Sequence, residues 1–299
     1  MPLWILATLI AAFAQNIRFM LQKHLKSTKL SSTGATLSRF LFSAPLLIVG
    51  LSIYLWQTGT TIPDYSIRFY IFSILGGTAQ ILATICVVAL FAERNFAVGI
   101  TFKKTEVLQT VFLGLLILQD RISFWGLVAV GIGFVAVLLL ADGKNTARTG
   151  HRFFNRAAGL GLLSGLLFAI SATGYRGASL EIAHDNPLIR AGFTLGFVVC
   201  FQTIATSLYL FIFEKGEFTR VLKSWRVSSL LGLASLIGSY GWFTAFTLQS
   251  AAYVKALGQI ELIFSFLTGI WIFKEKSTKR EISAMVLLCV SIVMFALWA

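Results

Sequence analysis

The sequence comprises 299 residues, of which 57% are hydrophobic and only 12% are charged, with a formal net charge of +13. An ordinary soluble domain carries about 25% charged residues, so this composition excludes a soluble enzyme, a disordered chain and a nucleic-acid-binding domain. We therefore expect most of the chain to lie in lipid. There the basic residues would set the orientation of the protein or meet an anionic group inside the bilayer.

Ten apolar segments are long enough to cross a bilayer, since a transmembrane helix needs about 20 mostly apolar residues. They cover residues 3–21, 34–56, 69–91, 96–118, 123–141, 157–180, 187–213, 227–248, 251–273 and 281–298. The first segment lacks the positive start of a signal peptide and is counted as a span. Open β-structure is excluded because each unpaired backbone group in lipid costs several kcal/mol. The sequence thus predicts an all-α polytopic membrane protein with ten transmembrane helices.

The two halves of the chain are weakly similar. Glu106 and Glu261 are 155 residues apart, and acidic residues are rare in the apolar segments. The same offset aligns further residues, among them Gly77 with Gly232 and Gly114 with Gly269. Because each half has an odd number of helices, the halves must have opposite orientations, which is typical of secondary carriers. We expect two inverted five-helix repeats, residues 1–141 and 157–299, joined by a linker at residues 142–156.

Basic residues are concentrated in the loops that follow odd-numbered spans, such as the linker and the loops near residues 23–29, 215–226 and 274–280. Cytoplasmic loops of membrane proteins are enriched in Lys and Arg. The loop charges therefore favour a cytoplasmic location for these loops and place both termini outside.

The most informative charged residues lie within spans, where a central charge costs roughly 2.5–3.5 kcal/mol. Lys103 and Glu106 are three residues apart and share a helix face. We expect Glu106 and Glu261 to face each other near the membrane midplane, where carriers bind substrates and coupling ions. Together with Lys103, Lys104 and Lys255 they would form a site of net positive charge, suited to a carboxylate or phosphate. The alternative is that these Lys–Glu pairs only fix helix packing.

Several other polar side chains could contribute to a site or simply pack between helices. The full set of candidate substrate-binding residues is Lys103, Lys104, Glu106, Lys255, Gln259, Glu261, Gln80, Tyr240 and Trp242, with Glu106 and Glu261 also as proton-coupling groups. Four arginines lie within about two turns of an expected helix end and are interpreted as snorkelling to the membrane surface; they are Arg18, Arg39, Arg176 and Arg190. No metal site or cofactor is expected, because the three cysteines and three histidines lack ligand spacing.

The ends of the fourth and ninth spans carry a family resemblance. They contain Lys104-Thr105-Glu106-Val107, Gly114 and Gln119-Asp120 in the first half, and Gln259-Ile260-Glu261-Leu262, Gly269 and Lys274-Glu275 in the second. These segments resemble the helix-end signature of the drug/metabolite transporter superfamily, EamA type. The sequence departs from the family by replacing its mid-helix proline with Val107 and Leu262, and its closing glycine with Gln119 and Lys274. The resemblance implies a ten-helix inner-membrane carrier, often an exporter, with both termini in the cytoplasm, opposite to the loop charges.

The sequence-based hypothesis is a secondary active transporter of a small amino-acid-like, zwitterionic or anionic metabolite. It would act as an exporter or exchanger by alternating access, in the inner (plasma) membrane, as a monomer or homodimer, with its substrate and lipid as partners and no nucleic acid. One alternative is a flippase of a lipid-linked substrate. Another is a non-transporting membrane scaffold or an intramembrane enzyme, although no nucleophile–base pair or metal ligands are visible at depth, so an enzyme is not expected.

Overall fold

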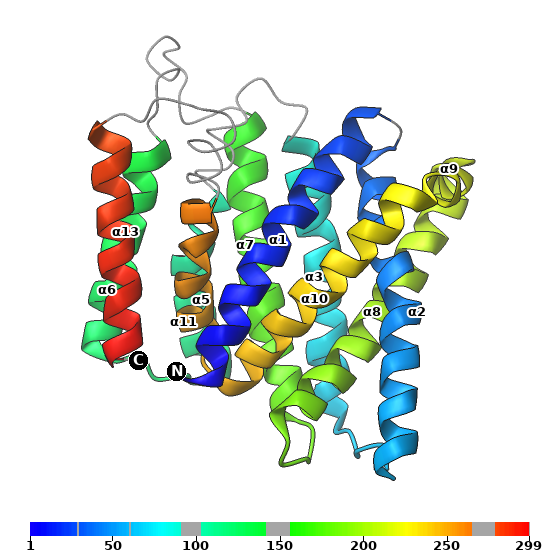
Figure 1. Cartoon of the computed structure of the whole chain (residues 1–299), viewed down its shortest axis with the longest axis horizontal. Helices are drawn as coiled ribbons and strands as arrows, with labels where there is room; N and C mark the ends of the chain where they lie inside the picture. The colour runs from blue at the N-terminus through cyan, green and yellow to red at the C-terminus, as the bar shows by residue number, and fades with distance from the viewer. Residues whose placement is uncertain (29, 60, 91–102, 142–155, 265–278, 299) are drawn as a thin grey trace.

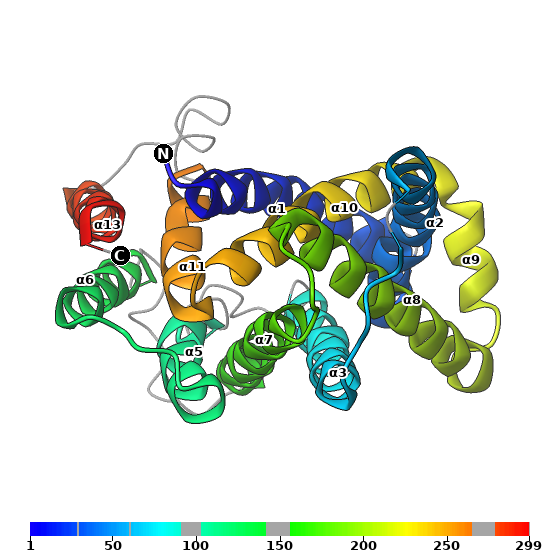
Figure 2. The same cartoon turned by 90° about the horizontal axis from the view of Figure 1, so that it is seen from below.

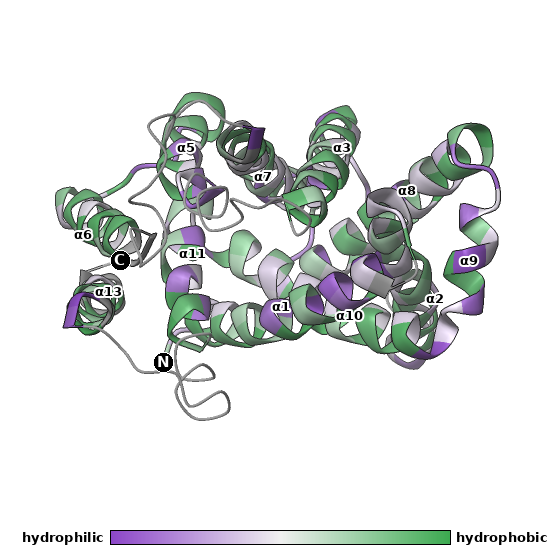
Figure 3. Ribbon diagram, turned by 90° about the horizontal axis from the view of Figure 1, so that it is seen from above, coloured by the Kyte–Doolittle hydropathy of each residue, from purple (hydrophilic) through white to green (hydrophobic). Residues whose placement is uncertain are grey.

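A computed structural model of the chain describes residues 1–28, 30–59, 61–90, 103–141, 156–264 and 279–298. Within these ranges the chain is helical and forms no β-sheet. Six helices are long and apolar enough to cross a membrane. They are α1 (Leu3–Thr28), α2 (Ser32–Thr58), α3 (Ile67–Leu90), α7 (Arg156–Leu180), α8 (Pro187–Phe213) and α10 (Trp225–Leu248). Figure 1 shows these helices side by side in a bundle, and Figure 3 shows apolar residues covering them. The protein is therefore an all-helical, membrane-embedded protein.

The remaining described helices are shorter. They are α5 (Glu106–Leu113), the π-helical turn η1 (Gly114–Leu118), α6 (Phe124–Ala141), α9 (Glu217–Lys223), α11 (Ala251–Leu257), the 3-10 turn η2 (Gly258–Ile260) and α13 (Lys279–Trp298). Helix α9 lies in a connection where the sequence predicted only a polar loop. Residues 91–102 and 265–278 are outside the described residues, as is most of the expected linker. They include the start of the expected fourth span with the loop before it, and the end of the expected ninth span with part of the loop after it.

Helix boundaries follow from local side chains. The Ser31 hydroxyl accepts a hydrogen bond from the Gly34 amide at 2.9 Å and caps the start of α2. At the start of α8, the Asn186 side chain accepts from the Leu188 amide at 2.9 Å, with Pro187 at the first helical position. These caps satisfy backbone groups that have no partner within the helix itself.

Two pairs of helices pack at very short range because glycine lies at the contact. A Cβ atom at Gly241 of α10 would lie 2.8 Å from the Ala7 carbonyl oxygen of α1. A Cβ atom at Gly174 of α7 would lie 2.9 Å from the Phe72 carbonyl oxygen of α3. Small residues allow such backbone approach in membrane bundles, where packing replaces the hydrophobic effect. Helices α6 and α13 form a third pair at one end of the bundle, beside α5 and α11 (Figures 1 and 2).

Candidate functional site

A buried ion-pair cluster, formed by Lys103, Lys104, Glu106, Lys255 and Glu261, lies where α5 and α11 meet α1 and α7. The Nζ atom of Lys255 lies 2.5 Å from Oε1 of Glu106, and Nζ of Lys103 lies 3.2 Å from Oε2 of the same carboxylate. Both oxygens of Glu106 therefore face an ammonium group. The side chain of Glu106 is only 4% exposed, so these charges interact with little screening by water.

The second carboxylate of the cluster has a different set of partners. Oε1 of Glu261 pairs with the Lys104 ammonium, and its Oε2 accepts a hydrogen bond from Nε2 of Gln15 at 2.6 Å. The side-chain oxygen of Gln15 in turn accepts from Nη2 of Arg18 at 3.1 Å. The pairing is crossed, because each glutamate pairs with a lysine from the other half of the sequence. Ion pairs thus hold the segments near residues 104 and 261 together.

Both glutamates directly follow an interruption of helical structure. Lys104 and Thr105 form a turn before Glu106, the first residue of α5. The 3-10 turn η2 (Gly258–Ile260) precedes Glu261, and the two interruptions are 155 residues apart. Backbone N–H groups at a helix start lack helical partners and favour a nearby carboxylate. The chain is therefore interrupted at both positions although neither segment contains the family proline.

Aromatic rings surround the Lys255 ammonium group. Its Nζ atom lies 5.1 Å from the ring centroid of Trp242, 5.5 Å from that of Phe168 and 5.7 Å from that of Phe246. Rings at such distances attract a cation, most strongly where water is excluded. The rings therefore help to stabilise the largely buried charge of Lys255.

Two small polar cavities adjoin the ion-pair cluster and share Gln15, Phe168, Trp242 and Lys255 as walls. The ion-pair cavity is further lined by Glu106, Gln259 and Glu261, among others, and the arginine cavity by Arg18, Gln80, Tyr175 and Ser239. Their volumes are about 10 Å³ and about 20 Å³, which leaves room for about one water molecule in each. Neither cavity can therefore hold a metabolite in this conformation.

The structure gathers most of the candidate residues from the sequence around these cavities. Gln259 lies beside the cluster and donates to the Lys255 carbonyl at 3.2 Å. Gln80 lines only the arginine cavity. Its oxygen accepts from the Tyr175 hydroxyl at 2.9 Å and from Nε2 of Gln202 at 3.0 Å. Among the described residues, no group of His, Cys, Asp or Glu side chains is arranged to hold a metal ion.

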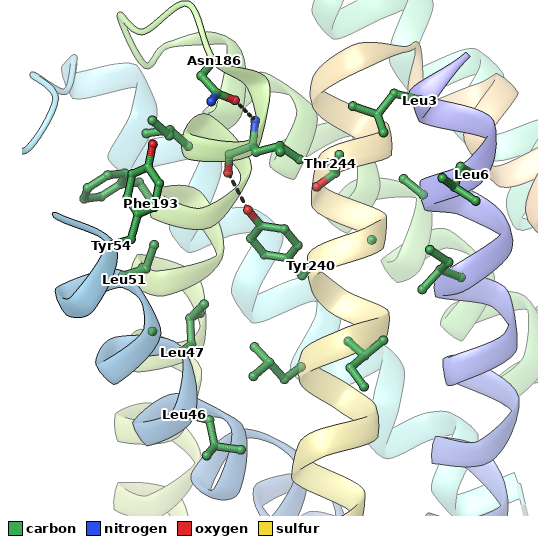
Figure 4. Close-up of a pocket in the computed structure, with 18 residues that line it drawn as sticks. Leu3, Leu6, Leu46, Leu47, Leu51, Tyr54, Asn186, Phe193, Tyr240 and Thr244 are labelled. Atoms are coloured by element: carbon green, nitrogen blue, oxygen red, sulfur yellow. Dashed lines mark hydrogen bonds between the residues drawn. The ribbon is translucent and has the colours of Figure 1, made fainter. Parts of the chain in front are cut away.

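Tyr240 is the candidate that the structure places elsewhere. It is two residues from Trp242 on α10, so the two side chains lie about 200° apart around the helix. The Tyr240 hydroxyl donates to the Leu188 carbonyl at 3.0 Å and faces an apolar groove, not the polar cavities (Figure 4). Tyr240 is therefore not part of the site around the ion pairs.

The interpretation of Arg18 and Arg39 as snorkelling side chains is wrong. Each residue is 2% exposed. Arg18 lies well inside α1, because the helix continues to Thr28 and does not end near residue 21. Arg39 donates to the hydroxyls of Thr84 at 3.4 Å and Ser239 at 3.2 Å. The run Gln15-Asn16-Ile17-Arg18 was the available sequence signal, since polar residues clustered on a continuing helix indicate an interior polar face.

Arg176, near the end of α7, is held by protein partners and does not reach freely to the membrane surface. Its Nε atom lies 2.8 Å from a carboxylate oxygen of Asp120. Its Nη1 atom donates to the carbonyls of Phe246 at 2.9 Å and Gln249 at 2.7 Å. Arg176 thus joins the end of η1 to the end of α10, where carbonyl groups lack helical partners.

No protein-family model and no curated protein matches the sequence. A solved structure, described only as the crystal structure of a protein, is similar to this chain with a TM-score of 0.72 and 13% sequence identity. The similarity covers 99% of this chain and 97% of the other. At this identity the likeness concerns the fold alone, and it extends over the whole chain.

Proposed function

We propose that this protein is a secondary active transporter of a small anionic or zwitterionic metabolite in the inner (plasma) membrane. The observation that carries the proposal is the buried, crossed ion-pair cluster at two helix interruptions. Interrupted helices that meet near the midplane are where secondary carriers bind substrates and ions. Charges at such depth are costly, and their usual reason is a pathway for a polar solute.

The packing of the helices supports ten spans in two inverted five-helix repeats. An offset of 155 residues relates α1 to α7, α2 to α8, α3 to α10 and α6 to α13. Under this relation the contact of α1 with α10 corresponds to the contact of α7 with α3. The pairs α2–α8 and α6–α13 each bring corresponding helices together. This is the pattern that a two-fold axis between the halves would produce.

Alternating access requires contacts between the halves that can separate and form again. The pairs Lys104–Glu261 and Lys255–Glu106 each link one half to the other. A charged solute that enters the ion-pair cavity can exchange partners with these groups, so that no charge remains unpaired while the helices move. Protonation of Glu106 or Glu261 in turn offers a second way to release the lysines.

Transport by purified protein in proteoliposomes tests this proposal. A thermal-shift screen of metabolites first selects a ligand, since binding to the native state raises apparent stability. Uptake of that ligand is then compared between the unaltered protein and the variants Lys104→Met and Glu106→Gln. Asp64→Asn, in an exposed loop, is the matched control. We expect a loss of at least about tenfold in the two site variants and none in the control; equal transport by all four proteins would overturn the proposal.

A second candidate function, flipping of a lipid-linked substrate, is favoured by one further feature. A groove of about 720 Å³ lies between α1, α2, α8 and α10 and is lined mostly by apolar side chains such as Leu6 and Leu47 (Figure 4). An acyl chain would fit such a lining. Space is open at Gly50, which lines the groove. Gly50→Phe should therefore abolish flipping of a lipid-linked sugar but leave transport of a water-soluble metabolite intact.

A further inference from the structure

Two buried hydrogen-bond donors at the polar cavities have no acceptor among the described residues. They are Nε of Arg18 and Nε1 of Trp242. The residue Arg18 lines the arginine cavity, and Trp242 lines both cavities. The two residues are 2% and 7% exposed. An unpaired donor in an apolar interior is costly. A ligand that offers only acceptor atoms, such as a carboxylate or phosphate, would satisfy both.

The lysines of the ion-pair cluster are, in contrast, already paired. Lys104 contacts Glu261, and Lys103 and Lys255 contact Glu106. An anionic group that bound to these lysines would have to displace a carboxylate. The unpaired donors are therefore better placed to receive the anionic group of a ligand than the lysines that the sequence indicated.

The charge balance around the cavities also points to an anion. Arg18, Arg39 and the three lysines of the cluster carry five positive charges, against two negative charges on Glu106 and Glu261. Arg18 and Arg39 are close enough to repel each other, and the described partners of Arg39 are the hydroxyls of Thr84 and Ser239. Around the cavities the described residues therefore leave a surplus of three buried positive charges. Each such charge costs several kcal/mol unless a counter-charge is brought in.

We propose that the arginine cavity binds the anionic group of the transported solute, and that this solute is an organic anion of net negative charge and not a zwitterion or cation. The proposal rests on the proposed transport function and identifies its substrate class. Arg18 and Trp242 bind the carboxylate or phosphate oxygens directly. Arg39 contributes positive charge nearby, because its guanidinium donates to the hydroxyl of Ser239, a residue that lines the same cavity.

The walls of the cavity fit an organic ion. Phe168, Phe243 and Phe246 provide apolar surface, whereas Gln80 and Ser171 provide polar groups. The present volume of about 20 Å³ holds about one water molecule. The solute therefore enters only after the helices around the cavity separate, as alternating access requires.

Thermal stabilisation of the purified protein tests the charge of the ligand. The probes are acetate, succinate, glycerol phosphate, neutral glycerol, the zwitterion betaine and chloride, all at equal ionic strength. We expect stabilisation by succinate or glycerol phosphate, less by acetate, and none by glycerol, betaine or chloride. Whether the dicarboxylate or the phosphate ester is stronger identifies the anionic group. Stabilisation by betaine, or equal stabilisation by chloride, would overturn the assignment.

Variants that remove single hydrogen-bond donors test whether Arg18 and Trp242 bind the anion. Trp242→Phe removes only the indole N–H, and Arg18→Gln removes the guanidinium; each should weaken dianion binding by about 10-fold to 100-fold, because a hydrogen bond to a charged group is lost. The matched controls are Trp225→Phe and Arg226→Gln, both exposed at the start of α10, and they should bind like the unaltered protein. Unchanged dianion binding by both cavity variants would refute the site.

The variant Arg39→Gln distinguishes a role of Arg39 in ligand binding from a role in helix packing. Arg39→Gln removes a buried charge that has no carboxylate partner among the described residues, so the unliganded protein should melt at the same or a higher temperature. The stabilisation by dianions should nevertheless decrease. A lower melting temperature with unchanged stabilisation would assign Arg39 to packing alone and overturn its part in the proposal. If dianions bind through Arg18 yet no solute is transported, the transport function fails while the anion site stands.

Discussion

Glu106 provides the sharpest test of how the cluster stabilises the fold. Glu106→Gln leaves two lysine ammonium groups, 2.5 Å and 3.2 Å from the former carboxylate oxygens, without their counter-charge. The side chains of Lys103 and Lys255 are only 7% and 14% exposed, so water cannot replace the lost partner. Removing one member of a buried pair typically costs about 3–5 kcal/mol. We expect the free energy of unfolding to decrease by about this amount.

The assay is equilibrium unfolding in mixed detergent micelles, with Asp64→Asn as the control for loss of one carboxylate. The control residue is exposed, so its effect should stay within about 0.5 kcal/mol. The double variant Glu106→Gln/Lys255→Met should be more stable than Glu106→Gln alone, because it also removes one orphaned charge. The reasoning is refuted if Glu106→Gln unfolds like the control, or if the double variant is less stable than the single one.

Three further predictions concern parts of the molecule outside the cluster. Arg176→Gln should lower the free energy of unfolding by about 1.5–3 kcal/mol, since it removes charged hydrogen bonds to a carboxylate and two carbonyls; an unchanged value in the same unfolding assay would contradict this role. Gly241→Ala should destabilise by about 1–3 kcal/mol because its methyl group would meet the α1 backbone, whereas Gly131→Ala, in open space, should not; equal effects would refute the close packing. The loop charges predict that Asp64→Cys reacts with a membrane-impermeant thiol reagent from outside and Lys223→Cys does not, and the reverse result would support the orientation of the resembled family.

The sequence predicted the charged cluster in part because helical spacing is a local property. Lys103 and Glu106 were expected to share a face, and their contact at 3.2 Å confirms it. The crossed pairs of Lys104 with Glu261 and Lys255 with Glu106 could not be derived. They depend on interruptions that rotate the chain just before each glutamate, and regular 3.6-residue periodicity does not describe such turns.

For a different reason, the sequence does not predict the burial of Arg18. The hydropathy pattern predicts that the first span ends near residue 21 and therefore that Arg18 lies at a membrane surface. The helix instead runs from Leu3 to Thr28, and its 26 residues extend over roughly 39 Å at 1.5 Å per residue. The hydrocarbon core is about 30 Å thick. Tertiary packing of α1 against α10 and η2, not its apolar length, decides which of its side chains are buried.

The surplus of buried positive charge bears on the mode of transport. Among the described residues, an empty carrier of the proposed kind must move its halves past each other with a surplus of three buried positive charges, whereas a bound dianion reduces that surplus to one. The reorientation of the empty protein should therefore be the slower step, and exchange of one anion for another should be faster than net export. Proteoliposomes loaded with labelled succinate should release it at least about tenfold faster when unlabelled succinate is present outside. A tenfold difference corresponds to a barrier for reorientation that is about 1.4 kcal/mol higher in the empty protein than in the loaded one. In the variant Arg39→Gln, with one charge fewer, this acceleration should decrease. Equal release with and without external anion would show that the buried charges do not control reorientation.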